Sequence, residues 1–303
     1  MGVAKFLWLL VPSLGIAELG GHFYFSRRPA SPSEWNAVRP AVERLRKKSE
    51  LIVIAPDWAE PNARAAFGDS LMPIRDVARP DVSAYSRAIE VSTLGVAAPE
   101  LTGWKVASEE RSGKFRLRVL ENPSPAHVVF DFLARVQEAH VADQTILGEA
   151  PCPWTTNARR EAGGLHGEQA FPAERHQCSV GSHFVGVTVV EDEQWKGRQC
   201  IWAEPAQGYT LSIRWDTVAV GAAIVGHATL PWWWEREKRG TPVELEVLVG
   251  GDSMGKFVHR DGDGWKGFRF ATGPHAMTVT SVEFRVRASP ARGRSFCFQA
   301  DTR

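Results

Sequence analysis

Three consecutive tryptophans, Trp232-Trp233-Trp234, are the sharpest candidate for a ligand contact in this chain. Exposed indole rings stack on the apolar faces of sugars, but indole rings also fill hydrophobic cores. Neighbouring side chains of a strand point to opposite faces, so within a strand at least one of the three rings would be exposed. The alternative is that all three rings fill the base of a core, with residues 235–239 as a solvated turn.

A second candidate is the glycine-rich segment around residue 262, which we expect to be the tip of a β-hairpin. His259, Asp261, Asp263 and Trp265 place an imidazole, two carboxylates and an indole in one short loop, and such a set can hydrogen-bond sugar hydroxyls. The two aspartates also suit a calcium shell, but the EF-hand spacing with its distal glutamate is missing. An ordinary turn favours the same residue types. The predicted ligand-binding residues are Trp232, Trp233, Trp234, His259, Asp261, Asp263 and Trp265, and no metal or cofactor is predicted.

The four cysteines predict disulfides, because an exported chain folds in an oxidising compartment. Sequential pairing joins Cys152 to Cys178 and Cys200 to Cys297. By loop-closure entropy these bonds would contribute roughly 3 and 4.7 kcal/mol. A metal site of His176, Cys178 and His183 is the alternative, although its spacing matches no standard zinc pattern.

No catalytic residue is predicted. Asp57, Glu60, Asp69 and Asp76 follow the first expected strand, where a pair of carboxylates could act as acid and base. Surface acids and helix caps explain the same residues. Neither a glycine-rich phosphate loop nor a nucleophile motif accompanies them.

The first 28 residues are expected to be an export segment. An apolar stretch over residues 6–17 follows Lys5, Glu18 interrupts it, and an aromatic stretch over residues 22–25 precedes Arg27 and Arg28. The uninterrupted core suits a signal peptide, whereas the whole stretch is long enough to span a membrane. We predict a retained single-pass anchor with the rest of the chain facing the periplasm or cell exterior, and a secreted protein if the segment is cleaved.

Composition allows two domains and argues against a nucleic-acid partner. The chain has 303 residues, of which 44% are hydrophobic, and a formal net charge of +1. This length suits two ordinary domains. Acidic and basic residues are interspersed, whereas nucleic-acid binding needs a basic patch.

Residue periodicity predicts an α+β chain in which residues 29–150 form a small α/β module. Ser31 and Glu34 make a capping box for a helix that begins at Pro32. A buried strand is expected at Leu51–Ala55. Further helices are expected up to Phe67 and over residues 81–91, and strands over residues 103–109 and 114–121.

Residues 151–303 are predicted to form an antiparallel β-sandwich, entered through a loop that the first disulfide ties down. Short β-rich segments alternate with turn signals, which is typical of sandwiches. The expected strands are residues 183–190, 198–203, 209–215, 222–230, 243–249, 256–260, 265–270, 277–287 and 295–299.

The second half resembles galactose-binding-like jelly-roll domains over residues 183–303. The resemblance rests on residues 211–215, 243–249, 261–265 and 296–298. It implies a two-sheet jelly roll whose loops at one end can bind sugar. The first half, from the apolar segment through residues 27–29 and 56–58, is similar to the extracytoplasmic tail of polytopic lipid-linked-sugar glycosyltransferases, without their membrane core.

We therefore predict a non-catalytic, membrane-anchored extracytoplasmic protein whose sandwich binds a glycan or another envelope protein. The alternatives are a glycosyltransferase-related or sugar-processing envelope enzyme using the Asp57 region, and a structural envelope component. A close pair of carboxylates in a pocket would favour the enzyme, and exposed tryptophans would favour the binding protein. The absence of both features would favour the structural component.

Overall fold

A computed structural model describes residues 12–21, 24, 28–47, 50–159, 170–179 and 183–303 and divides the chain into two compact units. The first unit comprises Met1–Asp76 and Tyr85–Pro125, and the second comprises Val77–Ala84 and Ala126–Arg303. The predicted boundary at residues 150/151 is therefore wrong. Strands that precede it pair with the sandwich, as β6 (His140–Thr145) does with β12 (Thr210–Ala219).

The predicted membrane anchor falls largely outside the described residues. Residues 12–21 are helical, but residues 1–11, 22–23 and 25–27 are not described. Among the described residues, no helix is both long and apolar enough to span a bilayer. The anchor stays a prediction.

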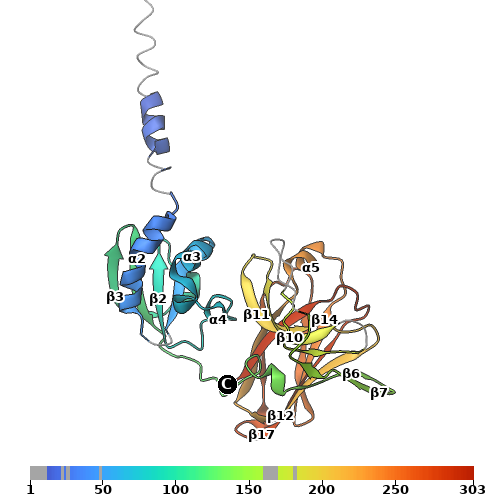
Figure 1. Ribbon diagram of the computed structural model, residues 1–303. Coiled ribbons are helices and arrows are strands. Elements are labelled where there is room, and N and C mark those ends of the chain that lie inside the picture. Colours follow the sequence, from blue (N-terminus) through green and yellow to red (C-terminus); the bar gives the residue numbers. More distant parts are fainter. Residues whose placement is uncertain (1–11, 22–23, 25–27, 48–49, 160–169, 180–182) are drawn as a thin grey trace, which may run out of the picture. The chain divides into compact units, whose positions relative to one another are not determined.

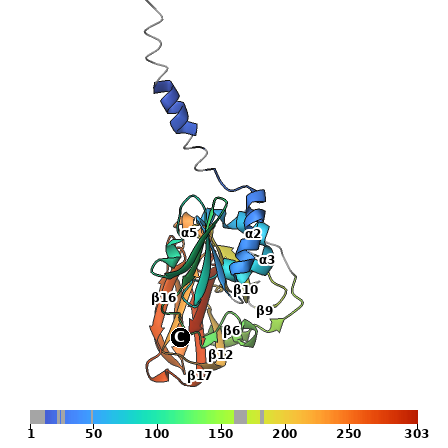
Figure 2. The ribbon, with the colours of Figure 1, turned by 90° about the vertical axis from the view of Figure 1, so that its left-hand side faces the viewer.

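The first unit is a four-stranded sheet with two helices on one face (Figures 1 and 2). Its strands run in the order β1-β2-β4-β3, and only the β1–β2 pair is parallel. Trp35 and Phe67 join the two helices, with ring centroids 5.8 Å apart. The elements are α2 (Pro32–Leu45), β1 (Leu51–Ala55), α3 (Glu60–Leu71), α4 (Ile74–Val77), β2 (Arg87–Ser92), β3 (Lys105–Ser112) and β4 (Phe115–Glu121).

The capping box and the first strand are confirmed, whereas the helix predicted over residues 81–91 is wrong. The Ser31 hydroxyl accepts the Glu34 amide, and the Glu34 carboxylate accepts the Ser31 amide at 2.7 Å. Residues 87–92 instead form β2, which is buried between β1 and β4. Glu90 can lie in this buried strand because Arg118 donates to its carboxylate at 2.5 Å.

The second unit is a sandwich of two antiparallel sheets, as predicted. One sheet has the order β16-β13-β18-β11-β10-β9-β8, with β5 paired to β18, and the other has the order β15-β14-β17-β12-β6-β7. The first sheet contains β5 (Phe130–Asp131), β8 (Trp154–Thr155), β9 (Arg175–Gln177), β10 (Phe184–Glu191), β11 (Gly197–Ala203), β13 (Ala223–Thr229), β16 (Lys266–Ala271) and β18 (Phe296–Thr302). The second contains β6, β7 (Gly148–Pro151), β12, β14 (Val243–Val249), β15 (Asp252–His259) and β17 (Val279–Arg287).

Alternate residues of both sheets build one hydrophobic core. Ile201 and Phe298 from the first sheet pack in the same cluster as Leu211 and Phe284 from the second. The centroids of Phe284 and Phe298 are 5.1 Å apart. The two sheets therefore face each other across a shared apolar layer.

Both predicted disulfides are present. Cys152 pairs with Cys178 and Cys200 with Cys297. The second bond links β11 to β18, which are neighbours in the first sheet. The first bond ties the segment after β7 to the end of β9.

One local expectation in the second unit is wrong, and one feature was not predicted. Residues 232–237, which lie in none of the expected strands, form a short helix, α5 (Trp232–Glu237). The turn at residues 260–265 is not a hairpin, because β15 pairs with β14 while β16 pairs with β13. This turn carries the chain from one sheet to the other.

Candidate functional site

Helix α5 holds the three tryptophans at one end of the sandwich. Pro231 precedes the helix, and its carbonyl accepts the Trp234 amide at 2.9 Å. None of the three rings is fully exposed. Trp234 packs against the sandwich core, and the Arg294 guanidinium lies 5.5 Å from its ring centroid. Trp232 and Trp233 lie further out and contact each other edge to face.

Trp195 belongs to the same aromatic group as Trp232 and Trp233, although it was not predicted from the sequence as a ligand-binding residue. It lies in the turn between β10 and β11 with a φ of 64°, and 50% of its surface is exposed. Its ring lies 4.4 Å from that of Trp232, and the Arg236 guanidinium is 4.7 Å from its centroid. A lone tryptophan in a polar turn between two strands was the available signal, because such a turn cannot bury a ring.

The polar residues near position 262 are mostly used inside the fold. His259 is fully buried, and its Nε2 lies 2.7 Å from the carboxylate of the equally buried Glu235. The same carboxylate accepts the Leu230 amide at 2.9 Å, the Gly262 amide at 2.7 Å and the Gly264 amide at 3.4 Å. His259 and Glu235 therefore fix the turn at residues 260–265 against α5.

The balance of these contacts lowers the pKa of Glu235. Burial raises that pKa, but the hydrogen bond and charge of His259 lower it, as do the amides of Leu230 and Gly262, and the result lies below 4.5. The ionised carboxylate is thus the form that the fold stabilises.

Asp261 and Asp263 bind neighbouring cations. Asp261 forms a buried ion pair with Arg294 and accepts the Gly240 amide at 2.7 Å. Asp263 accepts Lys266 Nζ and the Arg260 amide, each at 2.9 Å. Asp263 keeps a quarter of its side chain exposed, whereas Asp261 is buried.

Both the indole ring and the indole N–H of Trp265 make contacts within the fold. Its ring stacks on His227 with centroids 5.5 Å apart, and the Arg198 guanidinium lies 5.2 Å from its centroid. Its Nε1 donates to the Pro80 carbonyl at 2.9 Å. Burial lowers the pKa of His227, while the charge of Asp81 raises it.

A hollow of about 330 Å³ lies next to Trp265 and to the residues that precede Trp195 in the β10–β11 turn. The β10–β11 turn forms one wall and the turn at residues 260–265 forms the other. Asp192 shapes the first wall, because its carboxylate accepts the Gln194 and Lys196 amides and binds Arg198 at 2.8 Å. The lining residues are Asp192, Glu193, Gln194, Arg198, Gly262, Asp263, Gly264 and Trp265.

The site therefore combines an indole platform with a polar hollow. Of the predicted residues, Asp263 and Trp265 line the hollow, Trp232 and Trp233 belong to the aromatic group, and the other three are held in the interior of this end. Glu193, Gln194 and Trp195 were not foreseen. We call this surface, made of residues 192–198, α5 and residues 260–265, the loop end.

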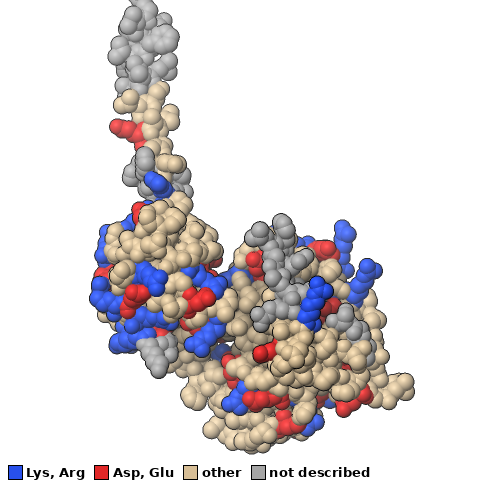
Figure 3. Space-filling view, viewed as in Figure 1, with Lys and Arg blue, Asp and Glu red and all other residues tan. Residues whose placement is uncertain are grey.

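Three of the four predicted carboxylates of the first unit bind groups other than a second carboxylate. Asp57 accepts the Trp58 amide at 2.9 Å, Asp69 binds Arg64 at 2.8 Å, and Asp76 accepts the Tyr85 hydroxyl at 3.2 Å. On the face shown in Figure 3, acidic and basic side chains alternate over this unit.

Comparisons with known proteins give structural likenesses of low score. No family model and no curated protein matches the chain. Solved structures of the CBM51-2 and INT domains of Clostridium perfringens ZmpB match at 10% identity and a TM-score of 0.30, over 54% of this chain and 37% of that one. The M60 catalytic domain with CBM51-1 and CBM51-2 of the same protein matches at 10% identity and a TM-score of 0.29, over 66% and 20%.

The match thus spans well under half of each of these solved chains. Both contain carbohydrate-binding modules by description. Neither supports the N-terminal resemblance to glycosyltransferases. At these scores the likenesses do not define a ligand.

Proposed function

We propose that this protein is a non-catalytic glycan-binding protein whose ligand site is the loop end. The observation that carries the proposal is the half-exposed Trp195 ring packed on Trp232, in the turn whose Glu193 and Gln194 line a polar hollow of about 330 Å³. Ligand sites typically join an apolar or aromatic wall to a few polar groups that fix orientation.

The chemistry of the loop end suits a sugar better than a strongly charged ligand. An indole face offers stacking to the C–H face of a pyranose. Glu193, Gln194 and Asp263 offer acceptors and an amide, and Arg198 offers donors. Two of the three lining carboxylates are already paired with bases, Asp192 with Arg198 and Asp263 with Lys266, so most of the charge of the lining is compensated within the fold.

Trp195→Ala tests the proposal on the full chain with a glycan array. Removing a stacked ring should cost about 1–3 kcal/mol of binding, by analogy with aromatic truncations at other interfaces. Trp58→Ala is the matched control, because Trp58 is 51% exposed and belongs to the first unit. It should leave binding unchanged. Trp195→Phe should retain part of the affinity because it keeps an aromatic face.

Thermal unfolding separates binding from folding in the same variants. Trp195→Ala should melt with the wild type, since its ring is half exposed and its Cβ is retained. Equal glycan binding by Trp195→Ala and wild type would contradict the proposal. Failure of the wild type to bind any glycan would favour the structural envelope component.

The N-terminal segment serves as a membrane anchor in this proposal, and residues 29–303 face the periplasm or cell exterior. The two disulfides support an oxidising compartment. Alkaline phosphatase fused after Arg303 should be active and should sediment with membranes. A fusion that is inactive in the envelope would exclude this location, and an active fusion released from membranes would indicate cleavage of the segment.

A further inference from the structure

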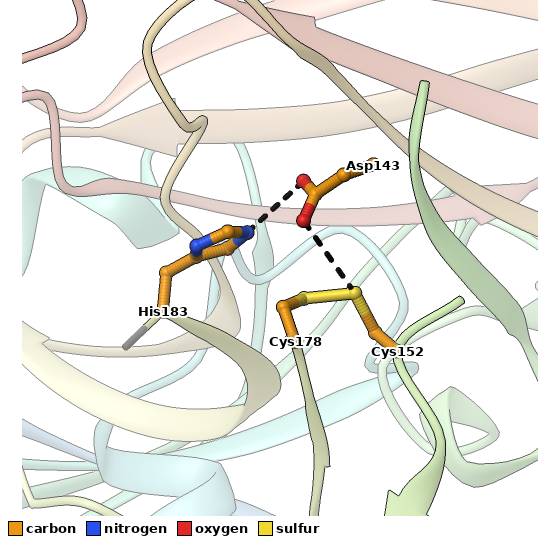
Figure 4. A group of neighbouring side chains, drawn as sticks. All are labelled: Asp143, Cys152, Cys178 and His183. Atoms are coloured by element: carbon orange, nitrogen blue, oxygen red, sulfur yellow. Dashed lines mark hydrogen bonds and ion pairs between the residues drawn. A yellow bond between two sulfur atoms is a disulfide. The ribbon is translucent and has the colours of Figure 1, made fainter. Parts of the chain in front are cut away.

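A buried cluster of four side chains lies where β6, β7, β9 and β10 meet, and it includes the residue before β10, whereas the loop end includes the turn after β10. Asp143, Cys152, Cys178 and His183 bring one carboxylate, two sulfurs and one imidazole nitrogen within 4.8 Å of one another (Figure 4). All four residues are buried. The metal alternative considered from the sequence included only Cys178 and His183 of this set.

Four elements of the second unit supply the cluster. Asp143 lies within β6, and Cys152 and Cys178 directly follow β7 and β9. His183 directly precedes β10. Ligands held at strands and strand ends are positioned by the sheet ladder rather than by a free loop.

The distances suit a tetrahedral ion. His183 Nε2 lies 3.0 Å from Asp143 Oδ1, and Cys152 Sγ lies 4.0 Å from Asp143 Oδ2. Zinc with about 2.3 Å bonds to sulfur and about 2.0–2.2 Å bonds to nitrogen and oxygen has neighbouring ligands about 3.4–3.8 Å apart. Once the disulfide is opened, rotation of the two cysteine side chains supplies the remaining separation.

The structure also corrects the ligand set. His176 is not available, because its Nδ1 lies 3.1 Å from the Cys152 carbonyl and its Nε2 lies 3.0 Å from the Val136 carbonyl. Asp143 takes its place. Two thiolates, one imidazole and one carboxylate are a donor set that zinc favours.

An open hollow borders the cluster at Cys152. This residue lines, with Trp154 and His176, an open hollow of about 590 Å³ on the outer face of the six-stranded sheet. Cys152 is only 2% exposed, so the hollow gives a reductant and a metal ion an approach that ends at a buried residue.

We propose that reduction of the Cys152–Cys178 bond converts this cluster into a Zn(II) site with Asp143, Cys152, Cys178 and His183 as ligands. A dithiol supplies the two electrons and two protons: the S–S bond breaks, two thiols form, and the dithiol becomes a disulfide. Zinc then displaces both thiol protons. This inference does not rest on glycan binding.

Zinc uptake by the full chain tests the proposal. A trialkylphosphine reduces the protein without air, taking oxygen from water to become its oxide, and alkylation with mass spectrometry confirms free thiols at Cys152 and Cys178. After addition of ZnCl₂ and gel filtration, we expect one zinc per reduced wild-type chain and none per oxidised chain.

Two variants test the proposed ligands, and a third variant is the control. The double variant Cys152→Ala/Cys178→Ala keeps the other cysteine pair and should take up no zinc under the same reduction. Asp143→Asn should weaken zinc binding at least about tenfold, as loss of metal-site partners does elsewhere. His140→Ala is the matched control, since His140 is exposed and outside the cluster, and it should bind zinc as the wild type does.

Circular dichroism keeps the test decisive if reduction unfolds the chain. Refolding of the reduced protein by one equivalent of zinc would support the proposal. A reduced chain with free thiols that binds no zinc would overturn it. Zinc uptake by the double variant equal to that of the wild type would also overturn it, because the metal would then lie elsewhere.

Discussion

Glu235 is the residue on which the geometry of the loop end depends most. It is fully buried, yet it accepts hydrogen bonds from α5's own entry, at Leu230, and from the turn at Gly262. Its partner His259 comes from β15. One carboxylate thus joins a helix, a strand and a turn. The helix and the turn contain most of the residues that were predicted from the sequence to bind a ligand.

Glu235→Gln should destabilise the sandwich by about 3–5 kcal/mol, the usual cost of removing one partner of a buried pair. The amide loses the charge that His259 faces and presents an NH₂ group to backbone donors. Glu237→Gln is the matched control in the same helix, because Glu237 is exposed, and it should cost almost nothing. Urea unfolding at pH 7 measures both variants.

The effect of Glu235→Gln should also depend on pH. The folded pKa of Glu235 is below its value of 4.5 in the unfolded chain. Ionised Glu235 therefore stabilises the fold above pH 4.5, and this contribution is lost as the pH falls below 4.5 through the folded pKa. The stability difference between wild type and Glu235→Gln should narrow below pH 4.5. A constant difference down to pH 3 would show that the ionised form is not the one stabilised.

At the scale of elements, the sequence predicted those helices and strands whose residue pattern is local. It missed elements that are stable only because of a contact with a residue far away in the chain. β14 (Val243–Val249) was predicted to the residue, because apolar and acidic residues alternate over its first five positions. The Ser31 cap was predicted because all of its parts lie within four consecutive positions. The strand β2 was missed, since a buried Glu90 is acceptable only with Arg118, which lies in another strand.

The structure of the loop end was even harder to predict from local sequence patterns. Three aromatic residues in a row favour a strand by propensity, and only Pro231 before them hinted at a helix start. A helix of six residues is too short to show periodicity. The contact between Trp195 and Trp232 joins a β10–β11 turn to α5, so no local pattern could have predicted it.

At the scale of the whole molecule, a short segment far upstream belongs to the sandwich. Residues Val77–Ala84, which we call the strap, are grouped with Ala126–Arg303 in the second unit. Four of the hydrogen bonds that attach it run from Gln199 N to Ala78 O (2.7 Å), from Arg198 Nη1 to Arg79 O (3.1 Å), from Trp265 Nε1 to Pro80 O (2.9 Å) and from Arg303 Nη1 to Ser83 Oγ (2.6 Å). The strap thus contacts Trp265 and Arg198, which line the hollow of the loop end.

A sandwich expressed without the strap should be less stable. Hydrogen bonds contribute roughly 0.5–1.5 kcal/mol each, so the four would contribute about 2–6 kcal/mol. Residues 126–303 alone should therefore unfold at a lower urea concentration than a fusion in which the strap is joined to Ala126 through Gly-Gly. The fusion is sterically reasonable because the Ala126 amide donates to the Ser83 carbonyl at 2.8 Å.

A fusion with a scrambled strap is the control, and it should behave like residues 126–303. Because the strap also holds Trp265, glycan binding should follow the same order, with the fusion binding as the full chain does and the fragment more weakly. Equal unfolding of fragment and fusion would mean that the strap is not part of the sandwich fold. Equal stability with unequal binding would instead limit its role to positioning the wall of the hollow, since Arg198 and Trp265 are the residues that it holds there.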